Sequence, residues 1–223
     1  GDPRAPLLLV LHGFPEFWAG WRAVMTRLAD RFHVVAPDQR GYNQSSKPAE
    51  LEAYRVGHLA ADVAALADAL SPDRPFALAG HDWGASIAYA FAFAHPERLS
   101  HLVIANGVHP ACFQRAIFED ETQRQASQYI NKLKAPEAEE RLSADGYRRL
   151  LRMITGFSKA DWMTEAEAEA YRSAWSQPGA LTGMLNWYRA SPVIVPEPGA
   201  PAPHSPILDM PVEVLTVKVP HLV

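Results

Sequence analysis

Cysteine is almost absent from this sequence of 223 residues, which contains one, Cys112. One cysteine excludes a disulfide bond within the chain, and a cysteine-poor composition is typical of proteins from a reducing compartment. Blocks of one charge are missing too, since 21 basic and 25 acidic residues give a net charge of −4. This balance favours neither a nucleic acid nor an anionic membrane surface as partner. We therefore expect a cytoplasmic protein that binds neither.

The sequence also lacks long apolar runs and metal-ligand patterns. The longest apolar run, residues 85–94, is too short to cross a bilayer and is typical of a buried helix, and the N-terminus carries no signal peptide. None of the nine histidines stands at ligand spacing from another histidine, Cys112 or a carboxylate. We expect no metal and no organic cofactor.

What the sequence does contain, over residues 1–108, is a regular alternation of strand and helix patterns. Such alternation predicts right-handed βαβ units, and therefore an α/β fold with a mostly parallel sheet covered by helices on both faces. The strands are expected at 6–12, 33–37, 76–79 and 102–105, and the helices at 17–30, 55–70 and 85–95.

The pattern changes after residue 108. Residues 110–190 predict helices alone, near 120–134, 144–155, 164–176 and 179–190. Thr164 and Glu167 form a capping box at the start of the third. Residues 191–211 include seven prolines, which favour an extended connector.

We expect three parts from these patterns. Residues 1–108 are the first part of an α/β core, 109–205 a helical cap with its proline-rich return, and 206–223 the start of the second part of the core. Such a cap covers the carboxyl edge of the sheet, where ligands bind in open α/β folds. The chain begins without Met, and its last residues predict another strand, so it resembles a fragment truncated at both ends.

Gly80-His81-Asp82-Trp83-Gly84 lies between a predicted strand and a predicted helix. This is the setting of a nucleophile elbow, in which the central residue stands on a strained turn and its small neighbours allow backbone to approach backbone. Serine, the usual occupant, needs a base, whereas a carboxylate with a pKa of about 4 is already ionised at neutral pH. Asp82 therefore indicates displacement at an sp³ carbon through an alkyl-ester intermediate.

His12-Gly13-Phe14-Pro15 follows the first predicted strand, where this kind of fold supplies one backbone N–H of an oxyanion hole. The other N–H comes from the residue after the nucleophile, Trp83. Because Pro15 has no N–H, Phe14 is the expected donor, and we expect the Phe14–Pro15 bond to be cis. We interpret His12 and His81 as structural.

Five segments resemble the α/β-hydrolase fold epoxide hydrolases, in consistent order over nearly all of the chain. They are His12–Trp18, Trp21-Arg22, Asp38–Tyr42, Gly80–Ala85 and Pro178–Arg189. The resemblance implies that a carboxylate on the elbow attacks an epoxide carbon while two cap tyrosines hydrogen-bond the epoxide oxygen. It also implies that a His–acid pair activates the water that hydrolyses the ester.

Three residues match these roles. Asp82 matches the nucleophile, Tyr188 matches one ring-opening tyrosine, and Tyr129 is the best candidate for the other. A phenol suits this step because it holds its proton at neutral pH yet can pass it to a developing alkoxide. Each tyrosine also has an ordinary interpretation as a packed amphipathic residue. The implied substrates are a small apolar epoxide and water, and the implied product is a vicinal diol.

Two alternatives remain open. Haloalkane and haloacid dehalogenases use the same aspartate, and in the former a tryptophan like Trp83 helps to bind the halide, although Trp83 can equally form a pocket wall. Phe14-Pro15-Glu16 resembles epoxide hydrolases more closely, and fluoroacetate dehalogenases favour arginine after the nucleophile. The other alternative, of a different class, is a catalytically incomplete fragment or a non-catalytic ligand-binding homologue.

The resemblance also implies residues that we do not find. The family's acid and catalytic histidine lie beyond its sixth and eighth strands, no histidine here has that context, and Asp209 precedes the final predicted strand. We therefore expect an epoxide to alkylate Asp82 and the ester to be hydrolysed very slowly.

Overall fold

The computed structural model describes residues 1–156, 159 and 162–223. Its described strands form one sheet of five in the order β2-β1-β3-β4-β5, and every pairing is parallel. The strands are β1 (Leu7–Leu11), β2 (His33–Val35), β3 (Phe76–His81), β4 (Leu99–Ala105) and β5 (His221–Leu222). The predicted α/β fold with a parallel sheet is confirmed. The strand expected at the C-terminal end is shorter than its pattern suggested.

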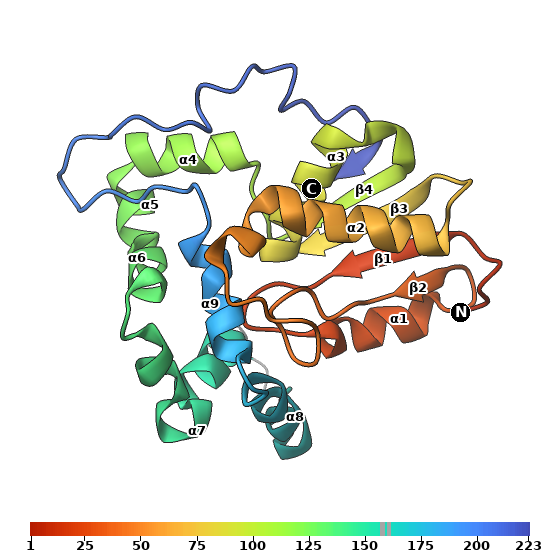
Figure 1. Cartoon of the computed structure of the whole chain (residues 1–223), viewed down its shortest axis with the longest axis horizontal. Coiled ribbons are helices and arrows are strands. Elements are labelled where there is room, and N and C mark those ends of the chain that lie inside the picture. The colour runs from red at the N-terminus through yellow and green to blue at the C-terminus, as the bar shows by residue number, and fades with distance from the viewer. Residues whose placement is uncertain (157–158, 160–161) are drawn as a thin grey trace.

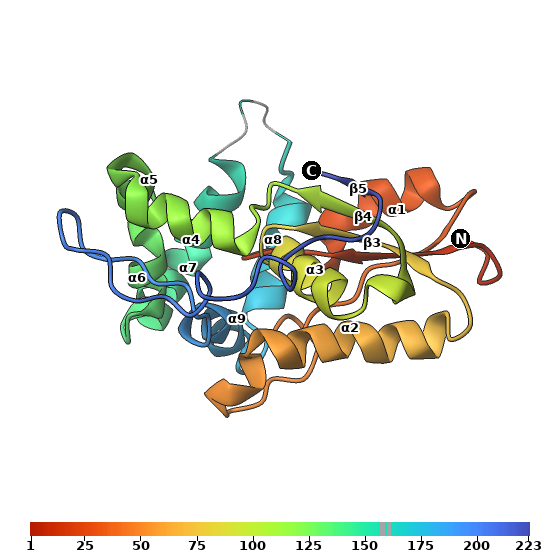
Figure 2. The same ribbon diagram turned by 90° about the horizontal axis from the view of Figure 1, so that it is seen from above.

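Helices cover both faces of the sheet, as Figure 2 shows. On one side α1 packs on Leu8 and Val10, and on the other Leu7, Leu9 and Leu11 join the main core. All five residues of β1 are buried, which explains its unbroken apolar pattern. The helical elements here are η1 (Trp18–Trp21), α1 (Arg22–Leu28), η2 (Leu51–Tyr54), α2 (Val56–Leu70), α3 (Trp83–Ala94) and η3 (Pro96–Arg98).

Helices α4 to α9, here called the helical block, lie beyond the carboxyl ends of the strands (Figure 1). They are α4 (Pro110–Glu119), α5 (Glu121–Ala126), α6 (Gln128–Lys134), α7 (Ala138–Thr155), α8 (Glu165–Trp175) and α9 (Ala180–Arg189). The predicted capping box opens α8, with Thr164 and Glu167 each bonded to the other's backbone N–H. No helix in the described part of the chain is long and apolar enough to cross a membrane.

The helical block differs from its sequence pattern in three places. Helix α4 was not predicted, although Pro110 at its first position and Phe113 and Ile117 one turn apart are signals of a helix. The helix expected over 120–134 is divided at Ser127 into α5 and α6. Helix α7 begins earlier than expected and is interrupted at residues 144–147, where three residues have positive φ.

The proline-rich connector, 191–211, has no strand or helix, but side chains of the helical block form hydrogen bonds with its backbone. Gln114 exchanges two hydrogen bonds of 2.9 Å with the backbone of Ile194. Further along the block, Asn131 donates to the Val195 carbonyl at 3.0 Å and Lys134 to the Val193 carbonyl at 2.8 Å. These side chains satisfy backbone groups that a partner strand would otherwise satisfy.

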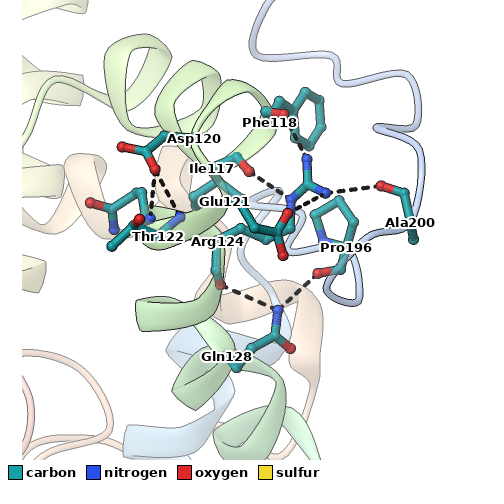
Figure 3. A network of polar contacts seen from close by, with 10 residues as sticks. Ile117, Phe118, Asp120, Glu121, Thr122, Arg124, Gln128, Pro196 and Ala200 are labelled. Carbon is teal, nitrogen blue, oxygen red and sulfur yellow. Dashed lines mark hydrogen bonds and ion pairs between the residues drawn. The ribbon is translucent and has the colours of Figure 1, made fainter.

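Arg124 is a further anchor and is buried, with 7% of its surface exposed. As Figure 3 shows, its guanidinium donates to the carbonyls of Ile117 (3.1 Å), Phe118 (2.6 Å) and Ala200 (2.9 Å). The first two belong to the last turn of α4, whose carbonyls have no partner within the helix. Gln128, also in Figure 3, donates to the Pro196 carbonyl at 2.8 Å. Arg124 therefore caps the C-terminal end of α4 and also anchors the connector.

We expect Arg124→Ala to lower the free energy of unfolding by about 2 kcal/mol, because it leaves one buried and two partly buried carbonyls without this donor. The matched control is Arg172→Ala, which removes ion pairs to the exposed Glu165 and Glu169 and should cost less than about 0.5 kcal/mol. Urea titration followed by circular dichroism measures both. Equal losses in the two variants would show that the Arg124 network adds nothing beyond a surface pair.

Candidate active site

Asp82 lies at the junction of β3 and α3 with φ 52° and ψ −118°. A side chain other than glycine rarely adopts a positive φ, and holding it there costs on the order of 1–3 kcal/mol. This is the backbone geometry of a nucleophile elbow. It puts the Asp82 side chain above the carboxyl edge of the sheet.

Three glycines make room for this turn. A Cβ at Gly80 would collide with the carbonyl of Gly84, and a Cβ at Gly84 would collide with that of Leu11. A Cβ at Gly13 would meet the Asp82 side chain itself. The elbow therefore fits only because the strand, the helix and the turn after β1 are all bare of side chains where they meet.

The Asp82 carboxylate faces backbone donors. Phe14 N–H donates to Oδ1 at 2.8 Å, and the Trp83 N–H also bonds the carboxylate. Burial raises the pKa of Asp82, and these two N–H groups oppose that rise by stabilising the anion. The two residues expected as oxyanion donors thus converge on the expected nucleophile. The Phe14–Pro15 bond is cis, as predicted.

His12 supports this turn as a neutral side chain. It is fully buried, and burial lowers its pKa. Its Nε2 accepts from the Gln39 backbone N–H at 3.1 Å, so the proton is on Nδ1, which donates to the Gly13 carbonyl at 3.0 Å. His12 therefore links the turn after β1 to the loop after β2, which agrees with its interpretation as structural.

Tyr188 and Tyr129 reach the same place from the helical block. Tyr188, on α9, is 3% exposed, and its ring lies edge-on to Trp83 and to Phe14, each at 5.1 Å between centroids. Tyr129, on α6, is 43% exposed, and its ring centroid is 6.4 Å from that of Tyr188. Sequence spacing predicts none of these ring contacts, because the rings come from separate elements of the chain.

Both phenols keep their protons at neutral pH. Burial raises the pKa of Tyr188 well above its usual value, and the negative charge of Asp82 raises it further. For Tyr129 the same two causes, burial first, raise the pKa to about 12. Two proton donors therefore stand beside an anionic carboxylate.

A cavity of about 180 Å³ joins these groups. Asp82, Tyr129 and Tyr188 supply its ionisable groups, and most of the remaining wall is apolar. The polar part of that wall is Ser86, Asn106 and Ser191, and its larger apolar residues are Trp83, Val108, Phe113, Ile130 and Val193. The core, the helical block and the connector all contribute to this wall.

A larger cavity of about 400 Å³ lies between α2 and the loop after β2, but its charged groups are already engaged. Arg40 pairs with Asp62 at 2.6 Å, and the Asp38 carboxylate accepts from the Trp18 backbone N–H at 3.1 Å and from the Asn43 side chain at 2.8 Å. A third cavity, of about 530 Å³, is lined by Glu16, Arg22 and Tyr171 among others and does not include Asp82. The cavity of about 180 Å³ holds the elbow carboxylate and is therefore the candidate active site.

Glu16 and His81 form an ion pair beside Asp82 that the sequence did not predict. The His81 Nδ1 is 3.1 Å from a Glu16 carboxylate oxygen, and this hydrogen bond raises the pKa of His81. The Glu16 charge raises the pKa of Asp82, and the His81 charge lowers it. The two residues are 65 positions apart, so no local pattern indicates the pair.

Residues 6–183 match the family model described as alpha/beta hydrolase fold. The chain is 38% identical over 192 residues to the AB hydrolase superfamily protein YfhM of Bacillus subtilis, covering 85% of this chain and 67% of that protein. It is 36% identical over 195 residues to epoxide hydrolase 4 of Mus musculus, covering 85% of this chain and 54% of that protein. The chain thus spans between about half and two thirds of these relatives.

Solved structures show the same likeness. One, described as novel epoxide hydrolases from metagenomes of hot environments, has a TM-score of 0.85 at 37% identity, covering 99% of this chain and 74% of that one. The Bacillus megaterium epoxide hydrolase in complex with an inhibitor has a TM-score of 0.79 at 34% identity, covering 84% of this chain and 66% of that one.

The Glu16–His81 pair predicts a pH-dependent stability. Because the folded pKa of His81 is raised, the pair stabilises the fold fully below the unfolded value of about 6.5, and this contribution is lost as pH rises through the folded pKa. Glu16→Gln should therefore lower Tm more at pH 5.5 than at pH 9. Glu97→Gln is the control, since Glu97 is exposed and 3.8 Å from His95. A Tm difference for Glu16→Gln that is the same at both pH values would contradict the pairing.

Proposed function

Because the chain belongs to the α/β-hydrolase fold family, we propose that it is part of an epoxide hydrolase that opens a small apolar epoxide to a vicinal diol. The observation that carries this proposal is one apolar cavity that holds an elbow carboxylate and two protonated phenols. The names of the relatives support it. In this proposal residues 109–205 act as a cap on a core formed by 1–108 and 206–223. We also propose a cytoplasmic location, because a single cysteine suits a reducing compartment.

In the first step Asp82 Oδ2 attacks an epoxide carbon while the Phe14 N–H holds Oδ1. The new bond joins Oδ2 to carbon, the carbon–oxygen bond of the ring breaks, and its electron pair goes to the epoxide oxygen. Tyr188 or Tyr129 passes its proton to this oxygen, which is a far stronger base than a phenolate. Alkylation also neutralises Asp82, and so removes the charge that raised the pKa of both phenols.

In the second step water attacks the ester carbonyl carbon and gives a proton to the activating base. The bond from that carbon to Oδ2 then breaks, the base returns the proton to the departing diol oxygen, and the proton left on the Asp82 carboxyl passes to the phenolate formed in the first step. The negative charge that develops on the Asp82 oxygen meets the N–H groups of Phe14 and Trp83, which act as the oxyanion hole. We propose that the histidine and acid that activate this water are not among residues 1–223. His12 and His81 are engaged in the contacts described above, and His204 pairs with Asp209 on the exposed connector. A positioned base contributes about 10²–10⁴-fold, so the ester should accumulate.

The dehalogenase alternative uses the same first attack with a halide as the leaving group. The Trp83 indole lines the cavity and is the group that would hold the halide. A halide needs no proton, however, whereas two phenols beside the nucleophile suit an oxygen leaving group. The paired tyrosines therefore favour the epoxide.

Incubation with styrene oxide should add one substrate mass to the intact protein, and Asp82→Asn should abolish the adduct. Asp73→Asn, which changes an exposed carboxylate, should leave the adduct unchanged. Mass spectrometry of the intact chain gives the readout. An adduct of equal yield in Asp82→Asn would overturn the nucleophile, and faster halide release from a haloalkane than adduct formation would favour a dehalogenase.

Tyr188→Phe should slow formation of the adduct by about 10²-fold, and the double variant with Tyr129→Phe should be slower than either single one, because proton transfer to the epoxide oxygen is then lost. Tyr147→Phe is the control, as Tyr147 lies in the helical block outside the cavity. Single-turnover mass spectrometry measures the rates. Wild-type rates in the double variant would remove both tyrosines from the mechanism.

A further inference from the structure

We propose that the loop after β2 positions Tyr188 by seating helix α9, so that Gly41, Gly183 and Trp187 are positioning residues of the active site. This rests on the proposed role of Tyr188 as proton donor. Tyr188 itself contacts the rings of Phe14 and Trp83 edge-on. Those contacts guide its ring, but they do not hold the helix that carries it.

The first contact between the loop and α9 is backbone against backbone. A Cβ at Gly183 would lie 2.7 Å from the Cα and the carbonyl oxygen of Gly41, and a Cβ at Gly41 would lie 2.9 Å from the carbonyl of Gly183. Gly41 also has φ +90°, which favours glycine. Glycine inside a helix costs about 0.5–1 kcal/mol relative to alanine, so Gly183 weakens α9 and in return allows this close approach.

The second contact is made by Trp187, one turn further along the same face of α9. It is 1% exposed, and its indole N–H donates to the Arg40 carbonyl at 2.8 Å. Its ring also lies edge-on to Tyr42 at 5.4 Å between centroids. Because Tyr188 is the next residue, it projects from a different side of the helix, toward Asp82.

The loop itself is fixed to the core. The Arg40 guanidinium makes two hydrogen bonds with the Asp62 carboxylate of α2, at 2.6 and 2.8 Å, and a third with the Ala53 carbonyl at 3.2 Å. Tyr42 is fully buried beneath Trp187 and packs edge-on to His12 at 4.6 Å between centroids. The contacts of Arg40, Gly41 and Tyr42 with Gly183 and Trp187, here called the seat, therefore connect α9 to the same turn that holds the Phe14 N–H against Asp82.

A substitution at the seat separates positioning from stability. Alanine at 183 has to push α9 off the loop, and a misplacement of about 1 Å can cost about 10²-fold in rate. The matched control is Gly57→Ala in α2, where a Cβ would meet nothing within 4 Å. Trp187→Phe is the second test variant, since it keeps a ring in place but loses the hydrogen bond to Arg40.

Two electrophiles give a readout that a loss of stability would not move. Styrene oxide needs a proton from Tyr188, whereas phenacyl bromide alkylates Asp82 without one, since bromide leaves with the electron pair of the carbon–bromine bond. We expect Gly183→Ala and Trp187→Phe to slow the epoxide reaction at least tenfold and to leave the bromide reaction within twofold of wild type. Gly57→Ala should change neither rate.

An unchanged epoxide rate in Gly183→Ala and Trp187→Phe, or an equal fall of both rates, would overturn the proposal. If Gly183→Ala fails to fold, Trp187→Phe decides the matter. If wild type reacts at Asp82 with the bromide but not with the epoxide, the proposed function fails instead. Crystal structures of wild type and Trp187→Phe then test the seat itself: we expect the Tyr188 hydroxyl to move by at least about 0.5 Å relative to Asp82, and an unmoved hydroxyl would contradict the seat.

Discussion

The hydrogen bond from the Phe14 N–H to Asp82 Oδ1, at 2.8 Å, joins the two turns on which the candidate active site depends. One turn follows β1 and the other follows β3, and these strands are neighbours in the sheet. The turns can meet because Gly13, Gly80 and Gly84 have no side chains at their closest points. With that contact in place, the Phe14 N–H holds Asp82 Oδ1.

The electrostatics of the site follow from this arrangement. Burial makes the Asp82 anion less stable, and the backbone N–H groups limit that effect without supplying a mobile proton. The anion in turn raises the pKa of Tyr129 and Tyr188, so the phenols hold their protons until the carboxylate is consumed. Attack and proton donation are thereby coupled, because the first event lowers the barrier to the second. This coupling supports an oxygen leaving group.

The features that were predicted correctly are motifs formed by residues close together in the sequence. The elbow around Asp82, the Phe14–Pro15 turn and the capping box at Thr164 could each be recognised from residues within a few positions of one another, and the parallel sheet follows from the strand–helix alternation. The contacts that no local pattern encodes are the ones that were missed. Glu16 meets His81 across 65 positions, and Trp187 meets the Arg40 carbonyl across 147.

The helical block was predicted less completely. Helix α4 was missed although its local signals, Pro110 and the Phe113–Ile117 spacing, are present, whereas the division at Ser127 depends on how α5 and α6 pack. Tyr129 matched its proposed role on weak local similarity, and its position beside Tyr188 comes from α6 packing near α9. Which tyrosine faces Asp82 is thus decided by tertiary packing and not by sequence spacing.

The most direct test is a crystal structure of the chain after reaction with styrene oxide. The account predicts continuous electron density from Asp82 Oδ2 to a substrate carbon, with the new hydroxyl group within hydrogen-bond distance of Tyr188 or Tyr129. Density on any other side chain, or a hydroxyl group that points away from both phenols, would contradict it.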